Sequence, residues 1–421
     1  MKKYLLFSVL LLLSASVVLG QGQFSEGLHF EHLPSWEHVL SKAKKENKLV
    51  LLYCYTTWCA PCKKMSTDVF PLKKVGSFYN AHYINAKVQM DSSANDDDDI
   101  KRWYPDANNI TLKYQVASFP TYLIFNEDGQ ILHRFSSSLD AESFIEKGKQ
   151  ALEPKNWYYP LLENYEKGDR TSEKIMQLGK LAREVGHDEK ANELFNEYLA
   201  MQQTIFTQEN LSLLYEITGS SMDRGFRIAL DSAELADGIL GKIGVSNNLV
   251  EDILVQETMR KVVDSKKEPD FVTIRTDLKS RYPGFADYVL SYVMMRYYRS
   301  TQEWNKYVEY ADEAIRHKNY EIPNYAIRSN AEIAFKNVSD KKLLEKALSW
   351  VEFVVKKKEV HFLDMHTYAN LLYKMGRVKE AIMQEKEVLK IARYANVDIS
   401  LYEDALNKME KGLPTWKGNN D

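Results

Sequence analysis

An apolar run that leads directly into a Cys-x-x-Cys pair constrains this chain more than any other stretch. The run covers Leu49 to Tyr55, and Cys59 and Cys62 follow it at the start of a helix-compatible segment. The two-residue spacer lets both sulfurs meet in one disulfide, and it places Cys59 at the amino end of the helix. There, unpaired N–H groups and the helix dipole favour the thiolate, which can lower a cysteine pKa from about 8.5 to roughly 3.5–7.5. A strand, a dithiol and a helix in this order predict a redox site.

The chain has three cysteines, Cys54, Cys59 and Cys62, and all of them lie in this stretch. Disulfide-stapled secreted domains scatter their cysteines, and a structural zinc site needs a second Cys or His pair. A disulfide across two residues stabilises little, because the loop-closure contribution grows with loop length. We therefore favour a redox role for Cys59 and Cys62 over a structural disulfide, and we predict no metal site. Cys54, in the middle of the strand, is expected to be a small buried hydrophobe, and whether it takes part in redox chemistry stays open.

The residues around the pair complete a longer motif. Trp58, Cys59, Pro61, Cys62 and Lys63 together form Trp-Cys-x-Pro-Cys-Lys, which resembles the thioredoxin superfamily. The resemblance implies an α/β thioredoxin-like fold, with a central mixed sheet flanked by helices. The hydrophobic patterns have the same order of elements as that fold. The expected strands cover residues 28–32, 49–55, 83–90, 122–125 and 130–135, and the expected helices cover 36–47, 60–69, 100–104 and 139–152.

The same resemblance implies roles for individual residues. Cys59 would be the nucleophile and Cys62 the resolving thiol, with no cofactor beyond their redox-active disulfide. The substrates would be protein disulfides, and a thiol electron donor or acceptor would restore the pair. Pro120 stands where the family has a cis-proline beside the dithiol. The other implied residues are Trp58 and Phe119 for substrate binding, with Pro61 and Lys87 in support.

Two features depart from the family pattern. Tyr53 stands six residues before Cys59, where thioredoxins commonly have a buried aspartate, so Lys87 would lack its acidic partner. The connection between Asp91 and Pro120 is also longer than in a compact thioredoxin, in a place where insertions carry function or stay mobile. Within it we expect a solvated acidic loop, with Asp96 to Asp99 starting the next short helix. Both departures favour a specialised exchanger over a general thioredoxin.

The first twenty residues have the pattern of a signal peptide. Lys2 and Lys3 precede an apolar run from Tyr4 to Leu13, and Gly20 supplies a small residue for cleavage. We therefore expect export, with membrane contact only through this segment. The family resemblance places such proteins in the periplasm of Gram-negative bacteria such as the Bacteroidetes. The net charge of −3 provides no basic stripe, so nucleic acid is not an expected partner.

From Pro154 onwards, strand patterns give way to amphipathic helical patterns that continue to the C-terminus. A helix, a glycine turn and an alanine five residues later occur at Gly186 and Ala191, and again at Gly376 and Ala381. Ala347 precedes Ala381 by the 34-residue period of a tetratricopeptide repeat. The region therefore resembles degenerate tetratricopeptide repeats, and it predicts an all-α repeat domain that holds a protein partner.

The sequence thus predicts a signal peptide at 1–20, a thioredoxin-like domain at 21–153 and an α-helical repeat domain at 154–421. The favoured function is an exported thiol–disulfide oxidoreductase. The alternative is a partner-binding scaffold with a vestigial redox site. The direction of electron flow, the substrate, the oligomeric state and the partner of the helical region stay open.

Overall fold

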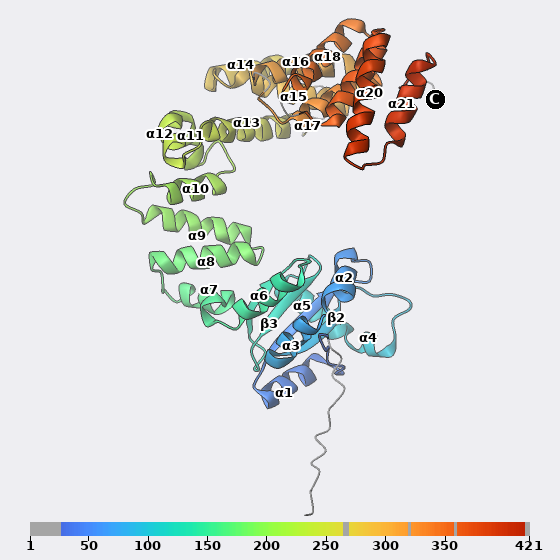
Figure 1. Ribbon diagram of the computed structural model, residues 1–421. Helices are drawn as coiled ribbons and strands as arrows, with labels where there is room; N and C mark the ends of the chain where they lie inside the picture. Colours follow the sequence, from blue (N-terminus) through green and yellow to red (C-terminus); the bar gives the residue numbers. More distant parts are fainter. Residues whose placement is uncertain (1–26, 264–268, 319–320, 358–359, 417–421) are drawn as a thin grey trace, which may run out of the picture. The chain divides into compact units, whose positions relative to one another are not determined.

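The computed structural model describes residues 27–263, 269–318, 321–357 and 360–416 (Figure 1). The predicted signal peptide lies outside the described residues. The chain divides into two compact units, the first ending at Ile205 and the second beginning at Phe206. The predicted change of domain after residue 153 falls inside the first unit, which adds three helices to the predicted α/β domain.

A four-stranded mixed sheet forms the centre of the first unit. The strands lie in the order β2-β1-β3-β4, with β1 parallel to β2 and antiparallel to β3, and β3 antiparallel to β4. The strand β1 is buried along nearly its whole length, as its continuous apolar run predicts for a central strand. The strands are β1 (Leu49–Tyr55), β2 (Tyr83–Gln89), β3 (Thr121–Phe125) and β4 (Ile131–Phe135).

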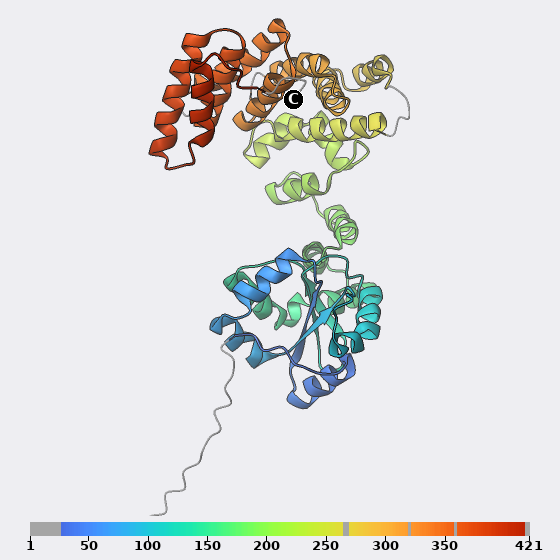
Figure 2. The ribbon, with the colours of Figure 1, turned by 90° about the vertical axis from the view of Figure 1, so that its right-hand side faces the viewer.

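Helices cover both faces of this sheet, as the strands between helices in Figure 2 show. They are α1 (Trp36–Glu46), α2 (Ala60–Lys64), the π-helix η1 (Met65–Val69), α3 (Lys73–His82), α4 (Asp98–Arg102), α5 (Tyr104–Tyr114) and α6 (Ala141–Ala151). Alternation along β1 sends Leu51 and Tyr53 toward α3 and α6, and it sends Leu52 and Cys54 toward α1 and α5. The α/β thioredoxin-like architecture predicted from the sequence is therefore confirmed.

The prediction of a first strand at residues 28–32 is wrong, because no strand forms there. This segment is extended, but Leu28 donates to the carbonyl of Phe70 and Glu31 donates to the carbonyl of Asn85. Because these two contacts go to different parts of the chain, they do not continue as a ladder. The helices α3 and α5 are the elements that the sequence patterns did not predict.

In the described residues from Pro154 onward the regular elements are all helices, which confirms the predicted change in secondary structure. The first unit adds the 3₁₀ turn η2 (Pro154–Asn156), α7 (Tyr158–Glu166), α8 (Ser172–Glu184) and α9 (Asp188–Ala200). The second unit holds α10 (Gln208–Ile217), α11 (Arg224–Asp231), α12 (Ala233–Leu240), α13 (Val245–Val263), α14 (Phe271–Arg281), α15 (Ala286–Ser300), α16 (Trp304–His317), α17 (Asn324–Asn337), α18 (Lys341–Val355), α19 (Phe362–Lys374), α20 (Val378–Tyr394) and α21 (Ser400–Glu410). Across the described ranges, no helix combines the length and the apolar content that crossing a membrane requires.

The two glycine turns noted in the sequence have the same structure. Gly186 and Gly376 follow α8 and α19 with φ values of 78° and 85°, a conformation that favours glycine. Ala191 and Ala381 are fully buried in the helices that follow, α9 and α20. The predicted helix–turn–helix pairs are confirmed at both places, whereas the kinship with tetratricopeptide repeats stays a prediction.

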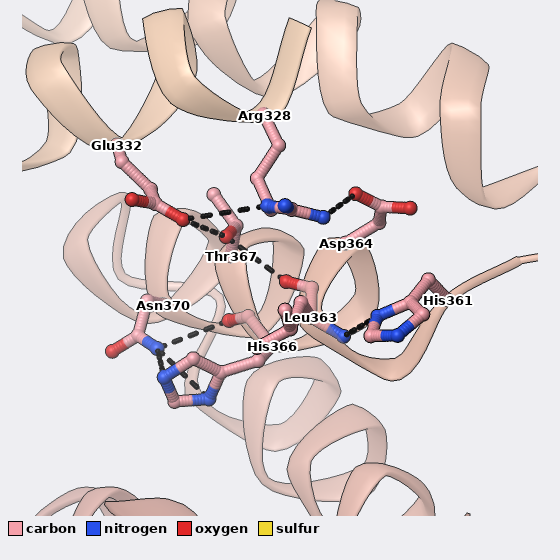
Figure 3. Close-up of polar contacts among 8 residues, drawn as sticks. All are labelled: Arg328, Glu332, His361, Leu363, Asp364, His366, Thr367 and Asn370. Atoms are coloured by element: carbon pink, nitrogen blue, oxygen red, sulfur yellow. Dashed lines mark hydrogen bonds and ion pairs between the residues drawn. The ribbon is translucent and has the colours of Figure 1, made fainter. Parts of the chain in front are cut away.

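Polar side chains link two helices of the second unit. Figure 3 shows Arg328 and Glu332 of α17 facing Asp364 and Thr367 of α19. Arg328 Nη1 donates to Asp364 Oδ1 at 2.8 Å, and Thr367 Oγ1 donates to Glu332 Oε1 at 3.3 Å. Because Asp364 is almost fully buried, its charge depends on the guanidinium of Arg328 for compensation.

Candidate active site

Cys59 and Cys62 form a disulfide where β1 runs into α2. Cys59 is the N-cap of α2, and the backbone N–H of Cys62 points at Cys59 Sγ over 3.1 Å. Pro61 lies in the first turn, where a missing N–H leaves no helical hydrogen bond unmade. The predicted placement of Cys59 at the start of the helix is therefore confirmed, and the geometry would favour its thiolate after reduction.

The start of the helix does not expose Cys59 in this disulfide-bonded state. Cys59 and Cys62 are each 2% exposed, and both belong to the apolar cluster that contains Met65 and Tyr53. The disulfide turns the side chain of Cys59 toward Cys62, which is why the helix start does not expose the sulfur. The sulfur of Cys59 is therefore closed to solvent while the disulfide is formed.

The side chains predicted to bind substrate gather at the same end of the sheet. Cys54 of β1 pairs with Thr121 of β3, so Pro120 lies beside the end of β1 that leads to the dithiol. The Phe119–Pro120 peptide bond is cis, as predicted. The rings of Trp58 and Phe119 meet edge to face, with centroids 5.9 Å apart, and Trp58 is 69% exposed. Trp58 thus presents a large apolar surface next to the disulfide.

Lys87 is not the buried lysine that the family pattern suggests. It pairs with Tyr53 in the sheet register, but its side chain is exposed and its Nζ lies 6.0 Å from the ring centroid of Phe30. An ammonium group buried without a carboxylate partner would be costly, and Tyr53 offers no such partner. Lys87 instead lines a cavity of about 480 Å³, together with Tyr53, Tyr55 and six other residues.

Tyr53 makes a contact that sequence reasoning missed. Its hydroxyl donates to the carbonyl oxygen of Cys62 at 3.2 Å, and the hydroxyl of Ser66 donates to the same oxygen at 3.1 Å. Burial raises the pKa of Tyr53 to about 12, so the hydroxyl keeps its proton at neutral pH. The sequence shows that Tyr53 replaces an acid, but it does not show where the phenol points.

The long connection after β2 is tied down by buried polar contacts. Asp96, expected to be solvated, is buried and accepts hydrogen bonds from Gln89 and Tyr104. As predicted, the acidic run starts a helix, since Asp97 caps α4 through the N–H of Ile100. The carboxylate of Asp91 accepts from Thr57, which immediately precedes Trp58, so the connection is anchored to the redox motif itself.

Cys54 lies apart from this chemistry. It is fully buried in the layer formed with α1 and α5, whereas Tyr53 and the disulfide belong to the other layer. Burial raises the pKa of its thiol to about 12. Within the part of the chain that the structure describes, no three His, Cys, Asp or Glu side chains gather closely enough to hold a metal ion.

Comparison with known proteins agrees with this geometry. Residues 36–152 match the family model of the thioredoxin-like domain. A thioredoxin-like protein of Synechocystis is 31% identical over 100 residues, which cover 24% of this chain and 78% of that protein. The chain belongs to the thioredoxin-like family. The helices from α7 onward lie beyond the residues that match it.

Other thioredoxin-like relatives match a similar share of the chain. The chloroplast thioredoxin Y of Oryza sativa is 31% identical over 119 residues, which cover 28% of this chain and 58% of that protein. The chain spans little more than half the length of this relative and of a second chloroplast thioredoxin Y, from Arabidopsis thaliana. The solution structure of a proposed disulphide-isomerase from Bacteroides thetaiotaomicron is 31% identical, with 30% of this chain and 94% of that chain covered and a TM-score of 0.26.

Proposed function

We propose that this protein is an exported thiol–disulfide oxidoreductase that exchanges disulfides with protein substrates through Cys59 and Cys62. The observation that carries the proposal is the Cys59–Cys62 disulfide at the start of α2, at the same sheet end as the cis Phe119–Pro120 bond. A disulfide across two residues contributes little to stability, which makes a purely structural role a weak explanation. Its position at a helix start favours the thiolate and hence a reactive role.

The reaction we propose has two exchange steps. The thiolate of Cys59 attacks a substrate disulfide, forming a mixed disulfide while the displaced substrate thiolate takes up a proton. The thiolate of Cys62 then attacks Cys59 Sγ, which releases the second substrate thiol and regenerates the Cys59–Cys62 disulfide. Trp58 and Phe119 supply the apolar surface that would receive the substrate chain.

An insulin-reduction assay with dithiothreitol tests this activity. We expect the wild-type protein to accelerate insulin precipitation and the Cys59→Ser variant to lose the acceleration. A redox titration of the pair against glutathione gives its reduction potential, and with it the direction of electron flow. No turnover, together with a potential far below that of the compartment, would favour the scaffold alternative.

The cellular location and the helical region belong to the same proposal. The charged and apolar pattern of residues 1–20 supports export to a Gram-negative periplasm. N-terminal sequencing of the protein from a periplasmic fraction tests cleavage near Gly20. The paired helices beyond Pro154 support a tetratricopeptide-like region that holds a protein partner, and cross-linking in cells tests for that partner.

A further inference from the structure

The main chain at Cys62 is held by a donor from another element, β1, in addition to donors of the helical segment that follows it. Its carbonyl oxygen accepts from the Tyr53 hydroxyl of β1 and from the Ser66 hydroxyl, besides the backbone N–H of Met65. The hydrogen-bond pattern changes at this point, because the π-helix η1 begins at Met65 and Phe70 donates five residues back to Met65. Single-turn π segments within a helix are rare and occur frequently at functional sites.

A cavity adjoins these contacts. It measures about 480 Å³, and both hydroxyl-bearing residues, Tyr53 and Ser66, line it. Lys87, which also lines it, is exposed, so the cavity communicates with solvent. A space of this size with several polar groups is large enough to hold water.

We propose that Tyr53, assisted by Ser66, is a positioning residue for the step in which Cys62 resolves the mixed disulfide. This inference rests on the proposed function. In that step the Cys62 thiol gives its proton to solvent water. Cys62 Sγ then bonds to Cys59 Sγ, and the Cys59–substrate S–S bond breaks, so that its electron pair leaves with the substrate thiolate.

The hydroxyl of Tyr53 supports this step through geometry. Burial raises its pKa to about 12, so it remains a donor to the Cys62 carbonyl throughout the neutral range. By linking β1 to the first turn after the dithiol, it limits how far Cys62 can drift when the disulfide opens. Small displacements of a reacting atom have large effects on rate.

Stopped-flow reaction of the reduced protein with dithiobis(nitrobenzoate) separates the two exchange steps. The first thionitrobenzoate leaves when Cys59 attacks, and the second leaves when Cys62 resolves the adduct. For Tyr53→Phe we expect an unchanged first phase and a second phase slower by about two- to tenfold, the size of one hydrogen bond. Tyr55→Phe is the matched control, because Tyr55 lines the same cavity and stacks on Tyr53, and it should leave both phases unchanged.

An unchanged second phase in Tyr53→Phe, or equal slowing in Tyr55→Phe, would overturn the inference. If Tyr53→Phe loses its near-UV circular dichroism, Ser66→Ala decides, since it removes the other hydroxyl from the same carbonyl. A slower second phase in Ser66→Ala supports the inference, and an unchanged one rejects it. Failure of the proposed function itself is distinct, because the wild-type protein would then show no insulin reduction.

Discussion

At the residue scale, two neighbours on β1 have opposite surroundings. Tyr53 lies in the layer of the disulfide and contacts the Cys62 backbone, whereas Cys54 faces the layer of α1 and α5. The period of two along a strand separates them, although they are adjacent in sequence. Cys54 therefore lies outside the layer that holds the Cys59–Cys62 disulfide.

Removing the resolving thiol should trap the intermediate. In Cys62→Ala, Cys59 can still attack a substrate disulfide, but the mixed disulfide has no internal thiol to release it. We expect covalent adducts that dithiothreitol removes, seen on non-reducing gels of cell extracts. Cys59→Ala is the control and should form none, and adducts of equal amount in both variants would contradict the assignment.

Cys54 should be inert in the folded protein. Its thiol is fully buried, and burial raises its pKa to about 12, so thiolate is scarce at neutral pH. In the Cys59→Ser/Cys62→Ser variant we expect no labelling by iodoacetamide, measured by mass spectrometry. Labelling should become complete in urea. Rapid labelling without denaturant would mean that Cys54 is accessible after all.

The sequence predicts the chemical identity of the site better than its surroundings. Cys59, Cys62 and Pro120 follow from motif and spacing, because those features are local in the chain or set by the order of elements. The burial of Cys59 and the contact from Tyr53 depend on tertiary packing, which no local pattern encodes. The family pattern likewise does not predict that Lys87 is exposed. Its partner across the strand pair is Tyr53 and not an acid, so no carboxylate compensates a buried ammonium group.

At the element scale, the buried ion pair between α17 and α19 should carry more stability than exposed pairs. Arg328→Ala leaves Asp364 buried without its partner, and we expect a loss of about 3 kcal/mol in the free energy of unfolding. Arg377→Ala, which breaks the exposed pair with Glu380, should cost far less. Urea unfolding followed by circular dichroism measures both, and equal losses would contradict this ranking.

Glu184 links α8 to β4 and α6, and it should make the stability of the fold depend on pH. Hydrogen bonds from His133 of β4 and Lys147 of α6 lower its pKa to about 2. Its folded pKa is below the unfolded value of about 4.3, so its contribution is present above that value and is lost as pH falls toward 2.

Glu184→Gln should therefore destabilise the protein at neutral pH by about 1–2 kcal/mol, discounted for partial exposure. The difference from wild type should disappear near the folded pKa. Glu142→Gln, in an exposed pair with Lys74, is the control and should show little change at any pH. Thermal unfolding at several pH values measures this, and a difference that persists in acid would exclude an ionic origin.

Sequence patterns identify the strong elements and miss the weakly patterned ones. The strand β1 has a long apolar run, and the hairpin combines the apolar strand β3 with a glycine turn before β4; both form as predicted. The helix α5 interrupts a polar stretch, and its apolar side chains Ala107 and Ile110 become evident only when they meet the sheet. The segment 28–32 has a strand pattern but finds no partner strand.

At the scale of the whole molecule, the helices α7 to α9 lie in the same compact unit as the thioredoxin-like domain. His133 and Arg134 of β4 are buried, although β4 is an edge strand, because α7 packs against it. Tyr158 of α7 is fully buried in the same unit. The folding unit thus exceeds the family match, which ends at residue 152.

Truncation tests this extent. A fragment of residues 21–205 should fold and reduce insulin, whereas a fragment of residues 21–153 exposes the β4 edge and should melt at a markedly lower temperature or aggregate. Differential scanning calorimetry of both fragments measures the difference. Equal melting temperatures would show that α7 to α9 contribute nothing to the redox domain.

The burial of Cys54 also limits the number of electrons that one molecule can carry. The chain has three cysteines, and with Cys54 enclosed, a molecule that acts through Cys59 and Cys62 carries two exchangeable electrons in its dithiol form and gives them up when the disulfide forms. In the proposed oxidoreductase these two electrons have no second internal disulfide to pass to, so each net oxidation or reduction of a substrate is completed by exchange with another molecule. In the proposed reaction, each substrate disulfide that is formed or reduced therefore requires one molecule of a two-electron partner to accept or supply that pair.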